Sequence, residues 1–497
     1  MCESRNQTIS KKGIIMIKNV NEIKILRINL SDKKITVEKM DERLVDLFLG
    51  GRGINRWILL NEIDKGAKAF DLQNKIIIGT GLLVGSSTPG ACRVQIDSLS
   101  PFNNGVASGN GGGFLGAQLK FAGWDNVIIE GKAKNPVYIY IKDKDVKIID
   151  AKNIWGKTTW ETEDLIRKIH GKKTAILSIG PAGENLVYSA AIIVDKYRAA
   201  ARCGLGAVMG SKNLKAIGVE GTGSILPINK NIFEKKSNEL RSNIIKSDVG
   251  KGLKEGGTTL WLNHKNDLSW NSVRNYQDSY AEPEKVKNLF PKNWSNIKSE
   301  KINTCYGCPV DCGFLRTITD GPYKGTKTAS CESNAFGDFS TKFDIYDPAI
   351  VHKAQEICNR YGLDVDSVAG AICWAYECYE KGIITKKDTD GLELIWGNDK
   401  PLILLLKKIA MKDGFGEILS YGCYKASKIV GKGSLKYCIH VKGQDLKEAV
   451  RTLKGWSLGV MVSPRAGTHT RGCPETEGMG ISKEDGEKYY GVPTAGD

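Results

Sequence analysis

The sequence predicts an α+β protein in which a β-rich N-terminal domain is followed by two mainly helical domains. Strand patterns and glycine-rich loops alternate through residues 1–220, with few helical patterns between them. Helical patterns dominate residues 221–415, where the composition shifts to Lys, Asn and Glu. Residues 416–497 end in a Gly-, Thr- and Pro-rich run without a closing element, so we expect the third domain to be incomplete. A length of 497 residues suits about three domains of ~150 residues each.

The composition is typical of a globular protein, and we expect a cytoplasmic location. Hydrophobic residues make up 41% of the chain, and no apolar run approaches the ~20 residues that span a bilayer. The N-terminus from Met1 to Asn6 is polar and lacks the apolar core of a secretory signal. The net charge of +16 comes from basic residues interleaved with acidic ones. It indicates an acidic protein partner or an anionic cofactor equally well, and we expect no nucleic-acid or membrane partner.

The first domain is expected to open with a strand hairpin over residues 19–37, broken at Ser31-Asp32. A glycine cluster, Gly50–Gly53, then leads into a helical pattern. Such a turn offers N–H groups to an anion such as phosphate, or it is simply a tight turn, and both readings stay open. Further strands are expected at 75–81, 92–97, 127–130, 137–141, 146–149 and 173–179, and helices at 114–122 and 161–169.

The densest glycine run, Gly105–Gly113, lies between the strand at 92–97 and the helix at 114–122. Glycine lets the backbone approach a neighbour that a Cβ would block. We therefore interpret this run as backbone pressed against a bulky ligand. Another glycine series, Arg202–Lys212, closes the domain.

The clearest helices lie in the second domain. Asp347 and Pro348 are a helix cap and a first-turn proline, and their helix runs to Tyr361 and stops at Gly362. A second helix is expected over 367–381, so the two form a helical hairpin.

Three cysteines stand in C-x2-C-x3-C spacing: Cys305, Cys308 and Cys312. Three thiolates with a distant fourth ligand are typical of an iron–sulfur cluster, whereas structural zinc more often uses two separated pairs. We interpret this stretch as a cluster loop, with a zinc site and unligated thiols as the alternatives. Thirteen cysteines in a chain of this length do not indicate a disulfide framework. Four others are expected to be small buried hydrophobes: Cys358, Cys373, Cys378 and Cys438.

Eight motifs, taken in order, resemble the aldehyde ferredoxin oxidoreductase family of tungsten (sometimes molybdenum) pterin enzymes. They are Gly50–Gly53, Ala91–Arg93, Ala107–Lys120, Gly123–Asp125, Ala199–Lys215, Cys305–Cys312, Tyr361–Asp364 and Arg465–Gly472. The resemblance extends over essentially the whole chain. It implies a β-rich base domain that holds two pterins around one tungsten, with a 4Fe-4S cluster beside them.

The resemblance also implies cofactor contacts, including magnesium that bridges the pterin phosphates. The positions that would contact the phosphates are Arg93, Asn110, Gly112 and the backbone near Gly206 and Ala207. These residue types suit the role, because Arg makes paired bonds to phosphate and glycine N–H groups reach where a Cβ would block. Asp364 corresponds to the last acid of a pterin-binding loop whose first acid is replaced here by Asn359.

By the same resemblance, Cys305, Cys308 and Cys312 are three ligands of the cluster. The family's fourth ligand lies well downstream of its histidine region, so we expect it beyond the end of this chain. The alternative is that Cys331 or Cys473 takes its place.

Two residues correspond to family positions near the metal, Glu332 and His469. A Glu and a His there could move protons and orient the substrate. The alternatives are a helix-capping Glu332 and a hydrogen-bonded loop His469. Cys331, directly before Glu332, could supply a soft thiolate to tungsten. Cys331 before Glu332, together with the stretch Trp456–Gly472, resembles the branch that includes the tungsten subunit of class II benzoyl-CoA reductases more than the simple aldehyde oxidisers.

The predicted function is oxidation of a small aldehyde to a carboxylate, with electrons passing through the cluster to ferredoxin or an iron–sulfur partner subunit. The alternative within the family is low-potential reduction of an aromatic or enoyl thioester in a larger complex. Both a homodimer and a subunit of a complex agree with the resemblance. A non-catalytic electron-transfer subunit and a zinc-stabilised scaffold are the alternatives of another class, and the glycine-rich phosphate regions argue against them.

Overall fold

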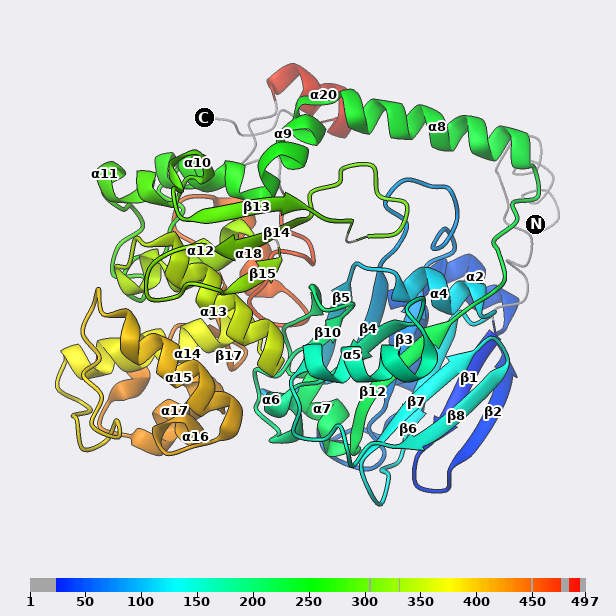
Figure 1. The fold of residues 1–497 in the computed structure, drawn as a ribbon, viewed down its shortest axis with the longest axis horizontal. Coiled ribbons are helices and arrows are strands. Elements are labelled where there is room, and N and C mark those ends of the chain that lie inside the picture. The colour runs from blue at the N-terminus through cyan, green and yellow to red at the C-terminus, as the bar shows by residue number, and fades with distance from the viewer. Residues whose placement is uncertain (1–23, 304, 330, 448–449, 475–481, 492–497) are drawn as a thin grey trace.

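The computed structural model describes residues 24–303, 305–329, 331–447, 450–474 and 482–491. Two six-stranded sheets with their helices form the N-terminal part, and a mainly helical part lies beside it (Figure 1). The predicted α+β class is confirmed. The start of the predicted hairpin, residues 19–23, and the run from Pro493 lie outside the described residues. Within the described ranges, no helix has the length and apolar character needed to cross a bilayer.

The first sheet has the strand order β2-β1-β6-β3-β4-β5. Its strands are β1 (Lys24–Asn29), β2 (Lys34–Lys39), β3 (Ile76–Thr80), β4 (Val94–Leu99), β5 (Val106–Gly111) and β6 (Asn126–Glu130). β1 and β6 are parallel, and the other neighbours are antiparallel. The predicted hairpin is β1–β2, where the Asn29 side chain accepts the Ser31 N–H and stabilises the turn.

The second sheet has the strand order β11-β10-β9-β12-β7-β8. Its strands are β7 (Val137–Lys142), β8 (Asp145–Asp150), β9 (Ala175–Ser178), β10 (Ile192–Val194), β11 (Arg198–Ala200) and β12 (Leu214–Glu220). Only β7 and β12 pair in parallel among these strands. β12 ends at the position where we placed the first domain boundary.

Helices cover the sheets in layers. They are α2 (Glu42–Phe48), α3 (Gly51–Glu62), α4 (Leu115–Phe121), α5 (Thr159–His170), α6 (Pro181–Glu184) and α7 (Leu205–Ser211). α3 packs Ile54 and Ile58 on one face of the first sheet. α4 and α7 share a single core with apolar residues of both sheets, and α5 packs Ile166 on the other face of the second sheet. The two sheets are therefore tied together through α4 and α7.

Most of the glycine run at 105–113 forms strand β5. Its close neighbours are protein atoms. A Cβ on Gly109 would lie 2.9 Å from Leu205 Cδ1 and 3.1 Å from the backbone of Ala200, and one on Gly111 would lie 3.0 Å from Val194. The glycines thus allow β5 to pack against α7 and the edge of the second sheet. Close approach of the backbone was expected, and at these glycines the close neighbour is protein, while a bulky ligand against the run stays a prediction.

The polypeptide then enters a helical segment that includes a small sheet. Its elements are α8 (Lys230–Lys246), α9 (Asp248–Gly256), η1 (Gly257–Trp261), α10 (Leu262–Asp267), α11 (Pro283–Val286), η2 (Lys287–Leu289), η3 (Pro291–Asn293), β13 (Ile297–Lys301), β14 (Phe314–Ile318) and β15 (Lys327–Ala329). The long helix α8 runs along the top of the molecule and leads to α9 (Figure 1).

The remaining elements complete the helical part. They are α12 (Ser333–Phe339), η4 (Thr341–Phe343), α13 (Pro348–Tyr361), α14 (Val365–Glu380), α15 (Asp399–Met411), α16 (Phe415–Leu419), α17 (Gly422–Val430), η5 (Ser434–Tyr437), β16 (His440–Val441), β17 (Gln444–Asp445), α18 (Lys454–Val462) and α20 (Lys483–Tyr490). The predicted hairpin is α13–α14. Asp347 caps α13 by accepting the Ala349 N–H, and Gly362 ends it in the left-handed conformation at φ 72°.

One core joins the helices from α12 to α17. It extends from Phe336 through Trp374 on α14 to Phe415 and Ala426, all nearly inaccessible to solvent. The boundary that we placed between residues 415 and 416 therefore falls inside a continuous core. A domain boundary would be expected where few contacts cross.

One cysteine expectation is corrected by the structure. Cys423 and Cys438 form a disulfide between α17 and the end of η5, with their Cα atoms 5.6 Å apart. Cys438 was expected to be a buried thiol, and a pairing across fifteen residues of sequence carries no local spacing signal. Cys358, Cys373 and Cys378 are buried thiols as expected.

Candidate redox-cofactor site

A row of polar side chains lies along one face of β4 and β5. Alternation along β4 places Gln95 and Asp97 on the face opposite the apolar Val94 and Ile96. Gln95 Nε2 donates to Asp97 Oδ2 and to Ser108 Oγ on β5, both at 2.9 Å. At the end of the row, Arg93 Nε donates to Asn110 Oδ1 at 2.6 Å. The structure thus brings two predicted phosphate contacts, Arg93 and Asn110, together.

A cavity of about 460 Å³ lies between the start of α3 and the segment around residue 470. We call it the arginine cavity, and its lining residues are Arg52, Arg56, Pro464, Thr470, Arg471 and Gly472. Among the described residues, one carboxylate forms an ion pair with these arginines: Asp97 Oδ1 lies 3.0 Å from Arg56 Nε.

Arg471 is a partly buried member of this cavity. It donates to Ser108 Oγ at 3.0 Å, but no described residue accepts a hydrogen bond from its buried Nε. Burial and the positive charges of Arg465 and Arg52 lower the pKa of Arg471 to about 10. The arginine cavity therefore has excess positive charge, and an anion would relieve it.

The glycine cluster at Gly50–Gly53 explains how the arginines reach this cavity. Gly50 and Gly51 adopt positive φ angles, and a Cβ on Gly50 would lie 2.9 Å from the Thr80 carbonyl oxygen. The glycines therefore form a tight turn beside β3, which starts α3 with Arg52 in its first turn. The glycines therefore form a tight turn, as one of the two alternatives predicted, and the groups that could contact an anion are the arginines.

The predicted cluster loop lies beside the end of β5. Cys305, Cys308 and Cys312 are all partly buried. Tyr306 N–H donates to the Gly113 carbonyl at 3.1 Å, and a Cβ on Gly112 would lie 2.9 Å from Cys305 Sγ. Gly112 thus faces the cluster loop. The Cys92 thiol, which sequence reasoning passed over, also hydrogen-bonds with Cys305.

The described part of the chain does not bring three or more His, Cys, Asp or Glu side chains to one point where they could hold a single metal ion. The assignment of this loop to an iron–sulfur cluster therefore stays a prediction from the cysteine spacing and the family resemblance.

Glu332 is linked to the cluster loop through Arg198. Glu332 Oε2 accepts from Thr258 Oγ1 at 2.5 Å, and its Oε1 lies 3.6 Å from Arg198 Nη1. Burial disfavours the charged form of Arg198, but Cys305, Glu332 and Cys312 together raise its pKa. Glu332 occupies the N-cap position of α12, but its side chain does not cap the helix. The capping alternative is therefore wrong.

His469 lies against Lys447 and Trp456. Lys447 Nζ is 2.7 Å from His469 Nδ1, and the imidazole stacks on the Trp456 ring at a centroid distance of 5.3 Å. His469 directly precedes Thr470 of the arginine cavity. The loop thus places a hydrogen-bonded imidazole next to the cavity.

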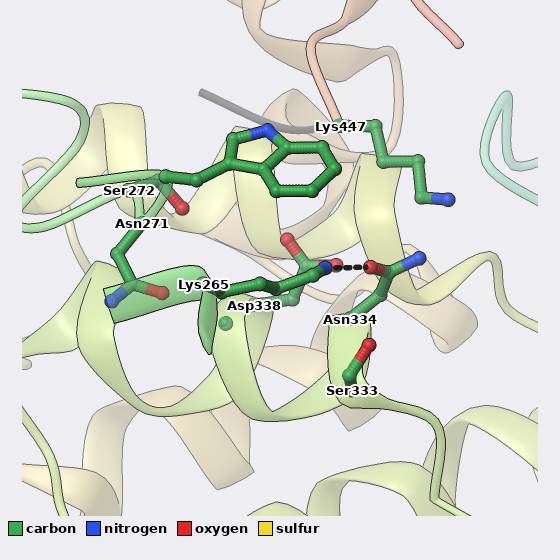
Figure 2. Close-up of a pocket in the computed structure, with 9 residues that line it drawn as sticks. Lys265, Asn271, Ser272, Ser333, Asn334, Asp338 and Lys447 are labelled. Carbon is green, nitrogen blue, oxygen red and sulfur yellow. Dashed lines mark hydrogen bonds between the residues drawn. The ribbon is translucent and has the colours of Figure 1, made fainter. Parts of the chain in front are cut away.

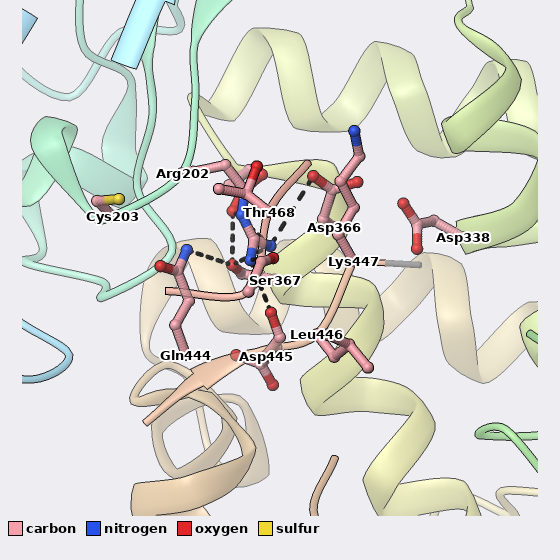
Figure 3. Close-up of polar contacts among 12 residues, drawn as sticks. Arg202, Cys203, Asp338, Asp366, Ser367, Gln444, Asp445, Leu446, Lys447 and Thr468 are labelled. Carbon is pink, nitrogen blue, oxygen red and sulfur yellow. Dashed lines mark hydrogen bonds and ion pairs between the residues drawn. The ribbon is translucent and has the colours of Figure 1, made fainter. Parts of the chain in front are cut away.

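Asp364 belongs to a buried polar cluster around Arg202. Arg202 donates to the carbonyl oxygens of Asp445 and Gly467, both at 2.8 Å, and its Nη1 lies 3.7 Å from Asp364. Burial raises the pKa of Asp364, while Arg202 opposes that shift. Figure 3 shows Arg202 beside Ser367 and Asp366 at the start of α14. Arg202 thereby ties the N-terminal part to α14 and to the loop that carries His469.

Comparisons of the sequence agree with this arrangement. Residues 25–221 match the family described as aldehyde ferredoxin oxidoreductase, N-terminal domain. Residues 235–491 match aldehyde ferredoxin oxidoreductase, domains 2 and 3. The chain belongs to the aldehyde ferredoxin oxidoreductase family. The predicted family is thus confirmed, and with it an oxidoreductase that acts on aldehydes.

Relatives in the aldehyde ferredoxin oxidoreductase family cover most of the chain. A tungsten-containing aldehyde ferredoxin oxidoreductase of Pyrococcus furiosus is 38% identical over 458 residues, which is 90% of this chain and 73% of the relative. The aliphatic sulfonate oxidoreductase, WOR-like subunit, of the same organism is 34% identical over 90% of this chain and 74% of its own length.

A solved structure shares the fold. It is the active-site complex BamBC of benzoyl coenzyme A reductase with 1,5-dienoyl-CoA, with a TM-score of 0.76 and 27% identity. The match covers 86% of this chain and 66% of the solved chain, so this chain spans just under two thirds of that length.

Not every position inferred from the aldehyde ferredoxin oxidoreductase family lies open to a ligand. The N–H groups of Gly206 and Ala207 already donate to the carbonyls of Ala190 and Gly204, both at 3.0 Å. Cys331 lies in the helical core at 3% exposure, and burial raises the pKa of its thiol to about 12. These surroundings favour a neutral, packed thiol over a metal-bound thiolate. Cys473 Sγ donates to the Trp456 carbonyl at 3.3 Å.

Sequence reasoning missed four residues that complete the site: Arg56, Arg202, Lys447 and Cys92. Arg202 and Cys92 stood inside quoted motifs, but no spacing distinguishes them from structural residues. Lys447 becomes relevant only because the fold places it beside His469, twenty-two residues later.

Proposed function

We propose that the protein is a tungstopterin iron–sulfur enzyme that oxidises an aldehyde to a carboxylate and passes the electrons to ferredoxin. The observation that carries this proposal is the arginine cavity, which lies beside the His469 loop and carries uncompensated positive charge. The relatives named tungsten-containing aldehyde ferredoxin oxidoreductase support the reaction. A cytoplasmic location, and a homodimer or a subunit of a complex, remain part of the proposal.

The residues present fit an anionic pterin. Arg471 has a buried Nε that meets no described acceptor, and Arg52 and Arg56 face the same cavity. Arg93 and Asn110 stand at the end of the β4–β5 row and are proposed to hold phosphate, directly or through bridging magnesium. Asp364 is proposed to orient the cofactor through Arg202. When bound, the tungsten pterin supplies the two-electron redox chemistry.

The cluster loop fits a one-electron relay. Cys305, Cys308 and Cys312 are the proposed ligands, and Gly112 allows the loop to lie directly against β5. We do not carry Cys331 forward as a tungsten ligand, because its thiol is packed in the core. Ferredoxin or an iron–sulfur partner subunit is the proposed electron acceptor.

Glu332 and His469 are the proposed proton-handling residues. Oxidation of an aldehyde with water gives a carboxylate, two electrons and three protons, so bases must accept protons close to the substrate. Lys447 donates to a ring nitrogen of His469, which favours the neutral imidazole that can take up a proton. Glu332, held by Thr258 and Arg198, is a carboxylate at a fixed position. Both residues would act as general bases.

Anaerobic assays of the purified protein test this function. Aldehyde-dependent reduction of a viologen dye, with tungsten or molybdenum and about four irons per chain, would support it. In that case Glu332→Gln and His469→Ala should each lower kcat about 100-fold while the metal content stays constant. A protein that contains only zinc and reduces no dye would overturn the proposal and leave a scaffold.

A second candidate follows from the fold likeness to the benzoyl coenzyme A reductase complex. In this candidate the same site reduces an aromatic or enoyl thioester with electrons from a partner subunit. Reduction of such a thioester by a low-potential dye, together with inactivity toward aldehydes, would favour it over aldehyde oxidation.

A further inference from the structure

A small cavity lies on the helical side of the site, and Lys447 forms part of its lining. Its volume of about 20 Å³ is enough for one water molecule, which needs about 10–15 Å³. Lys265, Trp270, Asn334, Asp338 and Lys447 contribute to its lining, and Figure 2 shows the hydrogen bond between Lys265 and Asn334 beside Asp338. We call it the water cavity. Lys265 and Asn334 are partly exposed, so this end of the cavity lies close to solvent.

Asp338 provides a buried proton acceptor in the water cavity. It is 2% exposed, and Lys342 Nζ donates to its Oδ1 at 2.5 Å. Its buried Oδ2 accepts from no N–H or hydroxyl of a described residue, although the Asp366 carboxyl shares a hydrogen bond with Asp338. The indole N–H of Trp270 is also buried without a described acceptor. A carboxylate oxygen and an indole N–H on one small cavity are suitable partners for a water molecule.

Lys447 connects this water cavity to His469. Its ammonium nitrogen lies 2.7 Å from His469 Nδ1, and the same side chain lines the water cavity together with Asp338. Asp366, on α14, lies in the same buried cluster, as Figure 3 shows. The Lys447 residue is 8% exposed, so bulk water has little access along its length.

We propose that Lys447 and Asp338 carry protons from His469 to the water cavity and so to solvent, with Asp366 positioning Lys447. Protonated His469 returns a proton to Lys447 as the lysine ammonium gives one up toward Asp338 and the cavity water. The water then passes a proton outward past Lys265 and Asn334. Each transfer moves one proton between two named groups, so no further reactant is needed. This inference rests on the proposed aldehyde oxidation, which releases protons.

The charges around the path support this direction. Burial raises the pKa of Asp338 well above its usual value, Lys342 opposes the shift, and the Asp366 carboxylate adds to it. Burial alone would also raise the pKa of Asp366, but Lys447 and Arg202 hold it below its usual range. Asp366 therefore stays ionised as the partner of Lys447, and Asp338 is the carboxyl that protonates more readily.

Other charged and titratable groups face Asp338 and Asp366 and contribute to the pH dependence of kcat. Lys342 lies 5.3 Å from the Tyr276 ring centre, Lys265 lines the water cavity, and Arg202 lies 3.8 Å from Asp366. Because Arg202 and Lys342 also stabilise the fold, we leave them unchanged in the test.

The kinetic test uses Asp338→Asn and Lys447→Met in the cofactor-containing enzyme with saturating dye. Each should lower kcat for aldehyde oxidation about tenfold, at the low end of proton-transfer effects, with KM for aldehyde unchanged. The solvent deuterium isotope effect on kcat should rise in both. The double variant should be no slower than the slower single variant, because both interrupt one path. Asp338→Glu should restore part of the rate.

A second measurement does not depend on turnover. Infrared spectra of the wild type should contain a protonated-carboxyl band that titrates above the usual aspartate pKa of about 3.9 and is missing in Asp338→Asn. This measurement decides the state of Asp338 even if the protein does not oxidise aldehydes, so failure of the path and failure of the proposed function can be told apart.

Glu356→Gln is the matched control. Glu356 is a buried carboxylate on α13 that pairs with Lys353 and Arg360, away from the water cavity. It should leave kcat, the isotope effect and the infrared band unchanged. Wild-type kcat and isotope effect in Asp338→Asn, additive losses in the double variant, or a carboxyl band that survives Asp338→Asn would each overturn the proposed path.

Discussion

The arginine cavity contains the partly buried Arg471 and the second cluster the buried Arg202, yet their charges are arranged in opposite ways. Arg202 lies within 3.8 Å of both Asp364 and Asp366 and donates to two carbonyl oxygens. In the arginine cavity, Arg471 faces Arg52 and Arg465, and the nearby Asp97 pairs with Arg56. Compensated charge indicates a structural connection, whereas uncompensated charge of one sign indicates a place for a ligand.

The largest expected effect comes from breaking the compensated cluster. Arg202→Met leaves Asp364 buried without its main cation and removes one of the cations near Asp366, so we expect the free energy of unfolding to fall by about 3–5 kcal/mol. Urea unfolding measures this change. The control is Arg274→Met, which removes a more exposed arginine that pairs with Asp344 and should cost less than about 1 kcal/mol. Equal losses in both variants would contradict the comparison.

The next effect concerns a buried histidine that forms no ion pair with the described residues. His352 Nδ1 donates to the Pro348 carbonyl at 2.6 Å, and no described residue meets its Nε2. Burial lowers the pKa of His352 from 6.5 to about 3. Below pH 6.5, His352 is therefore protonated in the unfolded chain, whereas in the folded protein it stays neutral down to about pH 3.

Stability should consequently fall with decreasing pH by up to about 1.4 kcal/mol per pH unit between pH 6.5 and 3 from this residue. His352→Phe should flatten this part of the pH profile of unfolding. An unchanged slope in the variant would show that His352 is already charged in the folded protein.

A smaller effect is expected where the cluster loop touches β5. In Gly112→Ala the new Cβ would lie 2.9 Å from Cys305 Sγ, so the thiol must move. We expect a stability loss of about 1 kcal/mol and a clear fall in iron per chain. Gly256→Ala is the control, because its Cβ would meet its nearest neighbour at 3.8 Å. Full iron content in Gly112→Ala would argue against Cys305 as a ligand.

The smallest effect on stability should come from the uncompensated cavity. Arg471→Gln removes one of several like charges, so the free energy of unfolding should change by less than about 0.5 kcal/mol. Tungsten and pterin content should nevertheless fall several-fold. The exposed Arg43→Gln should alter neither quantity. Loss of stability without loss of cofactor would reverse the comparison between the two arginine sites.

The sequence predicted the fold well where the signals are local. The cap at Asp347 and the stop at Gly362 correspond to local hydrogen bonds, and β4 alternates between apolar Val94 and Ile96 in the core and polar residues on the other face. The sequence did not identify the partner of the glycines in β5, because the backbone that Gly109 contacts, at Ala200, is ninety-one residues away in the sequence. The Cys423–Cys438 disulfide was missed for the same reason.

The candidate site shows the same difference between local signals and contacts made far apart in the sequence. Motifs identified the family and named Arg93 and Asn110, which the structure brings together, while the roles of Glu332 and His469 near the metal stay predictions. They could not identify the arginine cavity, since its charge excess depends on which carboxylates the fold brings close. The amides at Gly206 and Ala207 were named from the resemblance to the family, but in the structure they donate to the carbonyls of Ala190 and Gly204.

The arginine cavity has a consequence for how the protein is made. Its walls come from Arg52 and Arg56 on one side and from residues 464–472 on the other, more than four hundred residues later. At about 5–20 residues per second, a ribosome needs some twenty seconds or more to make the intervening chain. Throughout that time the first two arginines have no opposite wall. A ligand enclosed by this cavity can therefore be captured only after residue 472 has left the ribosome, so the apoprotein must first exist as a basic, cofactor-free molecule.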